Sequence, residues 1–319
     1  MEKDFSMIII PDTQDLSTSH PDRLFKMTQW IVNHAEELNL KMILHVGDLV
    51  NNGMSKENQW QNHKAAFDLI DQSGIPLVFA IGNHDYDNIL NENRNSEMFN
   101  KYCGMVRYLN KPWFGCMFEE GKTENMYAQL EIDGRKFLFL ALEFGPRDEV
   151  LEWANDVLGT HSDYNAIVVT HSYMYLHGER TKPGDNHNPK IYKGAHGAND
   201  GEDLWHKCLK RHKNVIAVFS GHHITDHVSY RFDLGEQYNL IFQSFQNWQC
   251  ADHGGDGRIR ILRYRLSENR IELNVFNPQS EKDETDEGFI TSFPIEVRKE
   301  QAEQFAVKKY PNSSVDTEK

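Results

Sequence analysis

Five short apolar segments of the sequence each end in side chains of the kind that bind metal ions. The ligand-type residues at these ends are, in chain order, Asp12, Gln14, Asp48, Asn83, His171 and His222. Carboxylate, amide and imidazole groups together suit Mn, Fe or Zn better than Ca, which prefers sites made of oxygen alone. One such residue by itself would be an ordinary helix cap or a structural turn residue. Five strand ends of this kind predict instead that the side chains meet at a metal site.

The segments that must position these side chains are predicted to be strands of a mainly parallel sheet. They are short and apolar, and amphipathic helical patterns separate the first three. These three strands are predicted at residues 6–11, 42–46 and 76–81, and the helices between them at residues 21–38 and around Trp60, Phe67 and Ile70. This alternation predicts right-handed βαβ units. Because the carboxyl ends of parallel strands meet at one edge of a sheet, the ligand-type residues are expected to converge there.

The second part of the chain adds a hairpin and further strands. Residues 125–132 and 136–142, joined by Asp133-Gly134, are predicted to form a β-hairpin. Helices are predicted at residues 148–158 and 202–211, and strands at 166–170, 215–220, 227–232, 238–244, 258–266, 271–276 and 293–297. An irregular insertion is predicted at residues 88–110 and a long functional loop at 172–199. The pattern as a whole predicts a single domain of residues 1–300, with two sheets flanked by helices, and a solvated tail at 301–319.

The blocks at the five strand ends resemble those of one enzyme family. They are Asp12-Thr13-Gln14, Gly47-Asp48, Gly82-Asn83-His84-Asp85, Thr170-His171 and Gly221-His222. In this order they resemble the blocks of the calcineurin-like metallophosphoesterases, and Gly-Asp followed by Gly-Asn-His-Asp is the most specific part of the match. The resemblance implies an α/β fold, a four-layer α/β/β/α sandwich with two mixed sheets, and two metal ions at the sheet edge.

The resemblance also implies a role for each ligand-type residue at a dinuclear site. Asp48 would bridge the two ions. Asp12 and Gln14 would hold the first ion, and the second ion would be held by Asn83, His171 and His222. The two divalent ions would be Mn, Fe or Zn, with Mn favoured. Such a pair activates a hydroxide that attacks phosphorus in line, and it neutralises charge on the phosphoryl oxygens.

A departing alkoxide also needs a proton, and His84 is the candidate acid. It directly follows the candidate ligand Asn83 in the sequence. Asp85 is expected to orient the ring of His84 and to favour its protonated form. The plainer interpretation, that His84 is a structural residue of the turn, fits less well with a complete Gly-Asn-His-Asp block.

Two positions depart from the family pattern. Residue 14 is Gln where relatives often have His, and an amide oxygen binds a metal less strongly than an imidazole does. The usual last block is Gly-His-any-His, whereas this chain has Gly221-His222-His223-Ile224. If that segment is extended, His222 and Ile224 face one way and His223 faces the other. In an extended segment His223 is therefore not expected to take the place of the missing ligand, and the alternatives that stay open are a kinked segment with His223 as the ligand, Asp226 or His227.

A few further polar residues are candidates for contacts to a substrate. They are Asn83 at the metal edge, Arg180 in the long loop and His223 after the last block. Gln246 and Asn247, which end a later predicted strand, are expected to form a second rim of the site.

The charge of the chain limits its partners. The net charge is −14, from 34 Lys and Arg residues against 48 Asp and Glu residues. This charge disfavours non-specific binding to nucleic acid or to anionic lipid, but bound cations make a small phosphate ester compatible with it. No apolar stretch approaches the ~18 residues of a membrane helix, and no signal peptide is visible. We therefore expect no membrane association and a cytoplasmic location.

These observations predict a metal-dependent hydrolase that acts on a small phosphoric ester. Two alternatives stay open. One is a phosphodiesterase or pyrophosphohydrolase that uses the same site, and the other is a non-catalytic protein of the same fold that binds metal or phosphate. The intact His84 and Asp85 favour a catalyst, whereas the altered last block mildly favours the non-catalytic alternative.

Overall fold

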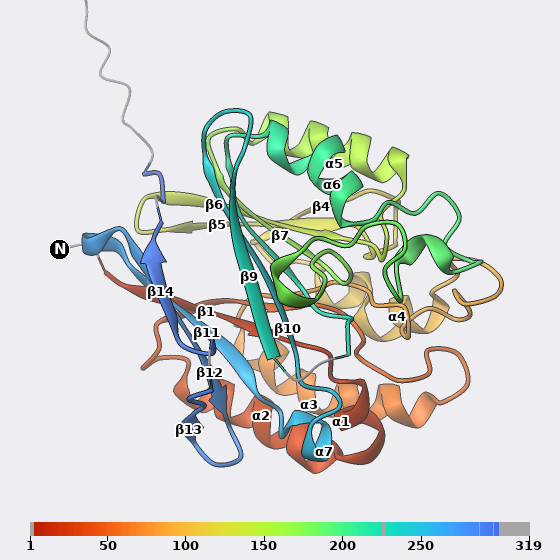
Figure 1. The fold of residues 1–319 in the computed structure, drawn as a ribbon. Helices are drawn as coiled ribbons and strands as arrows, with labels where there is room; N and C mark the ends of the chain where they lie inside the picture. Colours follow the sequence, from red (N-terminus) through yellow and green to blue (C-terminus); the bar gives the residue numbers. More distant parts are fainter. Residues whose placement is uncertain (1–2, 225–226, 287, 296, 300–319) are drawn as a thin grey trace, which may run out of the picture.

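Two mixed β-sheets lie face to face at the centre of the protein (Figure 1). The computed structural model describes residues 3–224, 227–286, 288–295 and 297–299. The first sheet contains, in spatial order, β13 (Lys282–Asp283), β12 (Arg270–Asn277), β11 (Ile259–Arg265), β1 (Phe5–Ile10), β2 (Leu40–His45) and β3 (Leu77–Phe79), and β14 (Thr291–Pro294) pairs with β12. The second sheet contains β4 (Phe114–Met117), β5 (Met126–Ile132), β6 (Arg135–Leu142), β7 (Asn165–Thr170), β8 (Val215–Ser220), β10 (Leu240–Asn247) and β9 (His227–Leu234).

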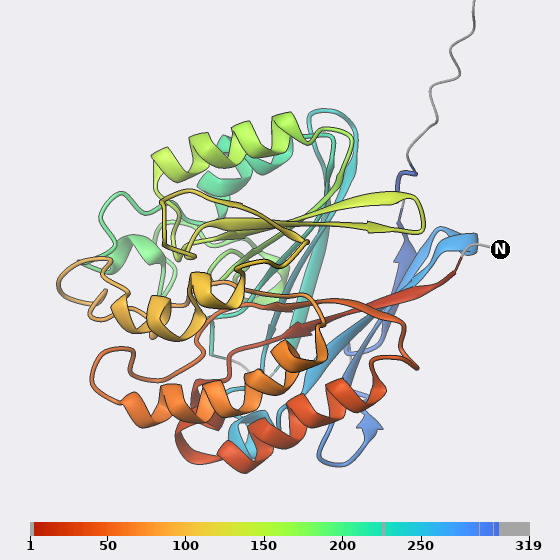
Figure 2. The same ribbon diagram turned by 180° about the vertical axis from the view of Figure 1, so that it is seen from behind.

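Helices cover the outer faces of both sheets, so the protein has four layers (Figures 1 and 2). The first sheet is covered by α1 (Gln14–Ser19), α2 (Pro21–His34), α3 (Glu57–Ser73) and α4 (Glu97–Cys103). The second sheet is covered by α5 (Asp148–Thr160) and α6 (Gly201–Lys207), and the short α7 (Asp252–Gly255) packs beside α1. One hydrophobic core fills the space between the sheets, and another lies under each helical layer. The predicted four-layer α/β/β/α sandwich with two mixed sheets is confirmed.

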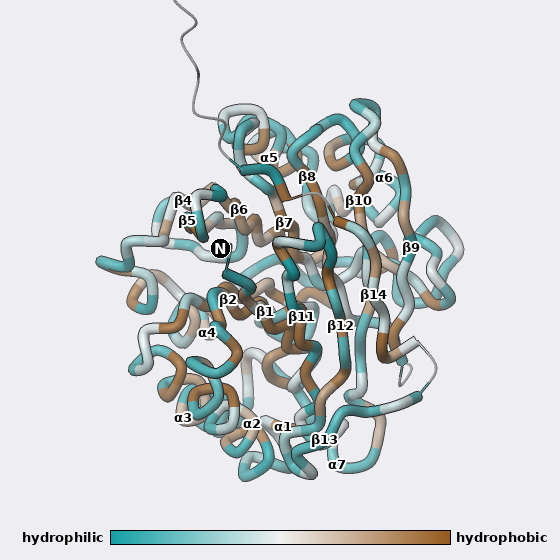
Figure 3. Tube along the Cα trace, turned by 90° about the vertical axis from the view of Figure 1, so that its left-hand side faces the viewer, coloured by the Kyte–Doolittle hydropathy of each residue, from teal (hydrophilic) through white to brown (hydrophobic). Residues whose placement is uncertain are grey.

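The first strand shows why a continuous apolar run forms a central strand. In β1, Met7 and Ile9 face the core between the sheets, whereas Ile8 and Ile10 face the helices. A strand that is buried on both faces needs apolar residues at every position. Strands β1, β2 and β3 pair in parallel, as predicted, and so do β7, β8 and β10 in the second sheet. Figure 3 shows the hydrophobic residues along these strands and hydrophilic residues in the outer loops.

Local details both confirm and correct the predictions. The Asp133-Gly134 hairpin is present, with φ values of 50° and 69° that suit a type I′ turn. The predicted irregular insertion at residues 88–110 is wrong in part, because it contains α4. Only Phe99 and Cys103 of α4 are buried, so this short helix shows too few apolar positions to produce a visible period.

Some predictions concern features that the structure does not test. The predicted tail at residues 301–319 and the alternative ligand Asp226 lie outside the described residues. Among the helices that the structure describes, none combines the length and the apolar character needed to cross a lipid bilayer. The cytoplasmic location and the poor affinity for nucleic acid stay predictions.

Candidate metal centre

The six predicted metal ligands come from strand ends that meet at one edge of the sandwich, and all six are buried. Nε2 of Gln14 donates a hydrogen bond to Oδ2 of Asp48 at 3.0 Å. Nε2 of His171 lies 3.1 Å from the same oxygen. The main-chain N–H of His222 donates to Oδ2 of Asp12 at 2.9 Å. Asp48, His171 and His222 each offer one ligand atom, and these atoms all lie within 4.8 Å of one another.

The two imidazoles are held so that one nitrogen of each faces this cluster. Nδ1 of His171 donates to the carbonyl of Val46 at 2.9 Å, and Nε2 of His222 donates to the carbonyl of His187 at 2.8 Å. Because a carbonyl only accepts, each of these nitrogens carries the ring proton of the neutral form. The other two nitrogens, Nε2 of His171 and Nδ1 of His222, lie 3.2 Å apart. A carbonyl that fixes the tautomer while the second nitrogen points inward is the usual arrangement of a metal-binding histidine.

The two carboxylates at this edge favour a positive charge beside them. Burial lowers the pKa of His171, but the charges of Asp48 and Asp12 outweigh it and raise that pKa to about 9. Burial works against ionisation of Asp48, yet His171 and His84 hold its pKa well below the usual range. A divalent ion that binds to Asp48, His171 and His222 would supply this positive charge and would require Nε2 of His171 to be unprotonated.

Three buried oxygens at the same edge have no hydrogen-bond partner among the residues that the structure describes. They are Oδ1 of Asp12, Oε1 of Gln14 and Oδ1 of Asn83. Buried polar atoms are nearly always paired, so three orphaned acceptors in one place need a positive partner. Burial also raises the pKa of Asp12 to about 7, against the lowering effect of His171. Free carboxylate and amide oxygens beside two inward-facing imidazole nitrogens fit a divalent metal.

The glycines of two blocks make room for a ligand from another strand. A Cβ on Gly221 would lie 2.0 Å from Oδ1 of Asp12, and a Cβ on Gly82 would lie 2.1 Å from Oδ1 of Asp48. Real Cβ atoms do not approach other atoms this closely. The glycines at these two positions are therefore needed for close packing around the ligands.

His84 and Asp85 are positioned differently from the prediction. Nδ1 of His84 donates to the carbonyl of Asn51 at 2.9 Å, and its main-chain N–H donates to Oδ1 of Asp48 at 3.0 Å. The carboxylate of Asp85 accepts hydrogen bonds from main-chain N–H groups at residues 49, 50 and 82. The expectation that Asp85 orients the ring of His84 is therefore corrected, because the Asn51 carbonyl holds that ring. Asp85 instead ties together the turns after β2 and β3.

The segment around His222 is kinked rather than extended. The φ angle of His222 is 79°, in the left-handed region, so side chains do not alternate as they would in a strand. The main-chain N–H groups of Gly221 and His222 donate to His171 and Asp12, and these bonds draw the chain around the cluster. The ring of His223 packs edge-on against Tyr175 at 4.7 Å, and its buried Nε2 has no partner in the described part of the chain. The expectation of an extended segment is wrong.

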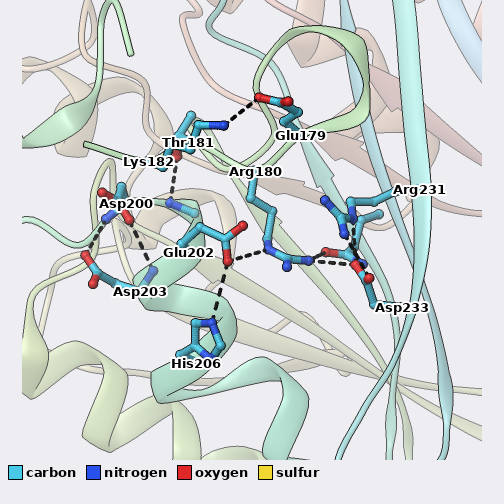
Figure 4. Close-up of polar contacts among 12 residues, drawn as sticks. Glu179, Arg180, Thr181, Lys182, Asp200, Glu202, Asp203, His206, Arg231 and Asp233 are labelled. Atoms are coloured by element: carbon cyan, nitrogen blue, oxygen red, sulfur yellow. Dashed lines mark hydrogen bonds and ion pairs between the residues drawn. The ribbon is translucent and has the colours of Figure 1, made fainter. Parts of the chain in front are cut away.

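Arg180 is engaged in a network of its own (Figure 4). Its Nη1 lies 2.7 Å from Oδ2 of Asp233, its Nε lies 3.2 Å from Oε2 of Glu202, and its guanidinium lies over the ring of Trp205 at 4.5 Å. The residue is only 6% exposed. The expected contact from Arg180 to a phosphate is therefore corrected, since two carboxylates already neutralise its charge.

Comparison with known proteins identifies the family. Residues 5–226 match the family model described as calcineurin-like phosphoesterase. The chain belongs to this family. It is 28% identical over 279 residues to "Uncharacterized protein YvnB" of Bacillus subtilis, which covers 86% of this chain and 20% of that protein. It is 26% identical over 190 residues to a "Probable cyclic nucleotide phosphodiesterase" of Moraxella catarrhalis, over 59% of this chain and 60% of that one. The chain therefore spans less than two thirds of either relative.

Solved structures agree with the fold of a calcineurin-like phosphoesterase. The purple acid phosphatase PPD1 of yellow lupin (Lupinus luteus) is similar with a TM-score of 0.55 and 15% identity, over 92% of this chain and 54% of that one. A dimetal phosphatase of Danio rerio is similar with a TM-score of 0.50 and 13% identity, over 86% of this chain and 96% of that one. At these identities the likeness concerns the fold alone.

Two further amides of this calcineurin-like phosphoesterase contact Asp12 and Gln14. Nδ2 of Asn247 donates to Oδ2 of Asp12 at 2.9 Å, which agrees with the expected second rim. Oε1 of Gln249 accepts from Nε2 of Gln14 at 2.6 Å, a contact that no motif of the sequence indicates. Strand β10 runs parallel to β8, so its carboxyl end reaches the same edge. That strand direction is the signal that would have identified Gln249.

Replacing Gly221 by alanine should weaken metal binding at this centre. The added Cβ overlaps Oδ1 of Asp12, so either the carboxylate or the turn must shift. Overpacking of this kind costs about 1–3 kcal/mol of stability, and we expect metal affinity to fall by about tenfold or more. Thermal unfolding and titration with Mn would measure both effects. Gly159→Ala in α5 is the matched control, because its Cβ meets nothing within 4 Å. Equal thermal stability and equal metal affinity of the two variants would contradict this prediction.

Proposed function

We propose that this protein is a metal-dependent hydrolase of phosphoric esters that uses two divalent ions. The observation that carries the proposal is the arrangement of His171 and His222. Main-chain carbonyls hold one nitrogen of each ring, and the other two nitrogens lie 3.2 Å apart beside Asp48. The orphaned oxygens of the amide and carboxylate residues around them support the same conclusion. Membership of the calcineurin-like phosphoesterase family supports hydrolysis of an ester of phosphoric acid.

The donor chemistry favours a division of the residues into two sets. Asp48 would be shared, Asp12 and Gln14 would complete the first set, and the second set would consist of the residues Asn83, His171 and His222. The first set offers oxygen alone and suits Mn, whereas the two imidazoles of the second set make it the tighter one. Bound divalent ions supply Lewis acidity that polarises a phosphoryl oxygen and lowers the pKa of water.

The chain itself contributes positioning and a proton. The Asn51 carbonyl holds Nδ1 of His84, and the link from its main-chain N–H to Asp48 keeps the residue beside the cluster. Nε2, the other ring nitrogen of His84, would give a proton to the leaving oxygen of the ester. The side-chain oxygen of Asn83 has no hydrogen-bond partner among the described residues. The NH₂ group of the same side chain, which directly precedes His84, can donate to a phosphoryl oxygen.

A phosphodiester substrate is a second candidate, favoured by one observation. The Moraxella catarrhalis relative carries the name "Probable cyclic nucleotide phosphodiesterase". A diester has one negative charge on phosphorus and a poorly departing alkoxide, so its hydrolysis depends on a donor such as His84.

Reconstitution with metal is the direct test of the proposed function. Protein stripped with a chelator should be inactive and should regain turnover as Mn is added, with two classes of binding site in calorimetry. The substrates should include 4-nitrophenyl phosphate, bis(4-nitrophenyl) phosphate and inorganic pyrophosphate, whose relative rates distinguish a monoesterase, a diesterase and a pyrophosphohydrolase. Metal binding without turnover on any of the three would contradict the catalytic proposal.

A further inference from the structure

We propose that residues 182–200, here called the cover loop, hold His222 in its metal-binding tautomer, so that docking of this loop determines how tightly the second metal is retained. The proposal rests on the proposed function, because it concerns the same metal centre. It assigns to the long loop a role in metal retention that no sequence motif indicates. The link is a main-chain atom, the carbonyl oxygen of His187.

The contact between the cover loop and His222 decides which ring nitrogen is free. The carbonyl of His187 accepts from Nε2 of His222 at 2.8 Å. Without this acceptor the ring can exchange its proton between the two nitrogens, and the Nδ1-protonated form presents no lone pair to the cluster. The φ angle of His187 is 59°, a value that residues other than glycine rarely adopt. Neighbouring groups must therefore hold this carbonyl in position.

Asn188 holds the His187 carbonyl in position. Its side chain is 1% exposed, and Nδ2 donates to the carbonyl of Lys182 at 2.8 Å and to Oδ2 of Asp200 at 3.3 Å. Its Oδ1 accepts from the main-chain N–H of Lys190 at 3.0 Å. One buried amide thus joins the two ends of the cover loop to its middle, next to His187.

The anchor of this arrangement is the beginning of α6 (Figure 4). Asp200 caps the helix by accepting from the main-chain N–H of Asp203 at 3.1 Å, and the carboxylate of Asp203 accepts from the main-chain N–H of Asp200 at 3.2 Å. Nζ of Lys190 forms ion pairs with both carboxylates. The helix itself is fixed by Leu204 in the outer core of the second sheet. A connected set of polar contacts therefore runs from a rigid helix to the candidate metal ligand.

The cover loop also shields the ligand on its apolar side. The ring of Tyr192 packs against Phe144 at 5.1 Å and lies 6.2 Å from the ring of His222. Tyr192 is only 7% exposed. The same loop therefore supplies the acceptor for His222 and limits the access of water to it, and both effects strengthen metal binding.

Asn188→Ala tests this proposal by releasing the His187 carbonyl while leaving every candidate ligand in place. Calorimetric titration with Mn and with Zn should show the tighter class of site weakened by about 10–100-fold, with the weaker class almost unchanged. In the metal-free protein, ¹⁵N NMR of His222 should show protonated Nε2 in the wild type and a mixture of tautomers in the variant. Lys182→Ala is the matched control, because the side chain of Lys182 forms its ion pair with the exposed Glu179, which lies just before the cover loop.

The outcomes separate this inference from the proposed function. A wild-type protein that binds no metal would overturn the proposed function and, with it, this inference. If the wild type binds metal, and Asn188→Ala keeps the same metal affinity and the same Nε2-protonated ring of His222, the inference alone is overturned. Lys190→Met provides a second variant that removes only the ion pairs to α6 from a partly exposed side chain. It should weaken the tighter site in the same direction but less, and an unchanged affinity would count against the inference.

Discussion

Asp48→Ala should remove both bound metal and activity, the largest loss of any single substitution in this protein. The carboxylate of Asp48 receives hydrogen bonds from Gln14 and from the main chain of His84, and it lies 3.1 Å from Nε2 of His171. Its loss removes the ligand that we propose both ions share, and it removes the electrostatic partner of His171. We expect kcat/KM to fall by at least about a hundredfold, the scale of removing one preorganised electrostatic contact.

Metal analysis of the purified variant, together with turnover under added Mn, measures this effect. Asp156→Ala is the control, because Asp156 is an exposed residue on α5. That variant should keep both the metal and the rate of the wild type. Full turnover of Asp48→Ala in excess Mn would contradict the assignment of the whole centre.

His84→Ala should slow hydrolysis in proportion to how much the leaving group needs a proton. Esters of simple alcohols leave poorly without protonation, so their kcat should fall by about 10²–10⁴-fold. A 4-nitrophenyl ester departs as a stable anion, and its rate should change much less. Metal content should stay close to that of the wild type, because Asp48, His171 and His222 are all retained.

The comparison of the two kinds of ester is the informative measurement. His206→Ala controls for the loss of a histidine at an exposed position on α6, and it should leave both rates unchanged. Equal losses of His84→Ala on both esters, or a loss of metal, would show that His84 supports binding rather than proton transfer.

The sequence by itself determined the fold class and the convergence of the candidate ligands. A continuous apolar run such as β1 is compatible with a strand buried on both faces, and the helices between such runs require a parallel sheet. Parallel strands place their carboxyl ends at one edge, so Asp12, Asp48 and Asn83 had to lie near one another. The local sequence pattern is sufficient for these conclusions, because it decides which segments form strands or helices and in which direction the strands run.

Only the tertiary structure decided where the individual side chains point. Asp85 faces main-chain N–H groups of a different turn, and Arg180 faces Glu202 and Asp233, which lie far away in the sequence. His222 leaves the extended conformation because hydrogen bonds from distant strands draw its segment around the cluster. The His187 carbonyl that fixes the ring of His222 is a main-chain atom, and a sequence pattern carries no information about its direction. Side-chain orientation at this site therefore depends on long-range contacts, which outweigh the local preferences that a sequence displays.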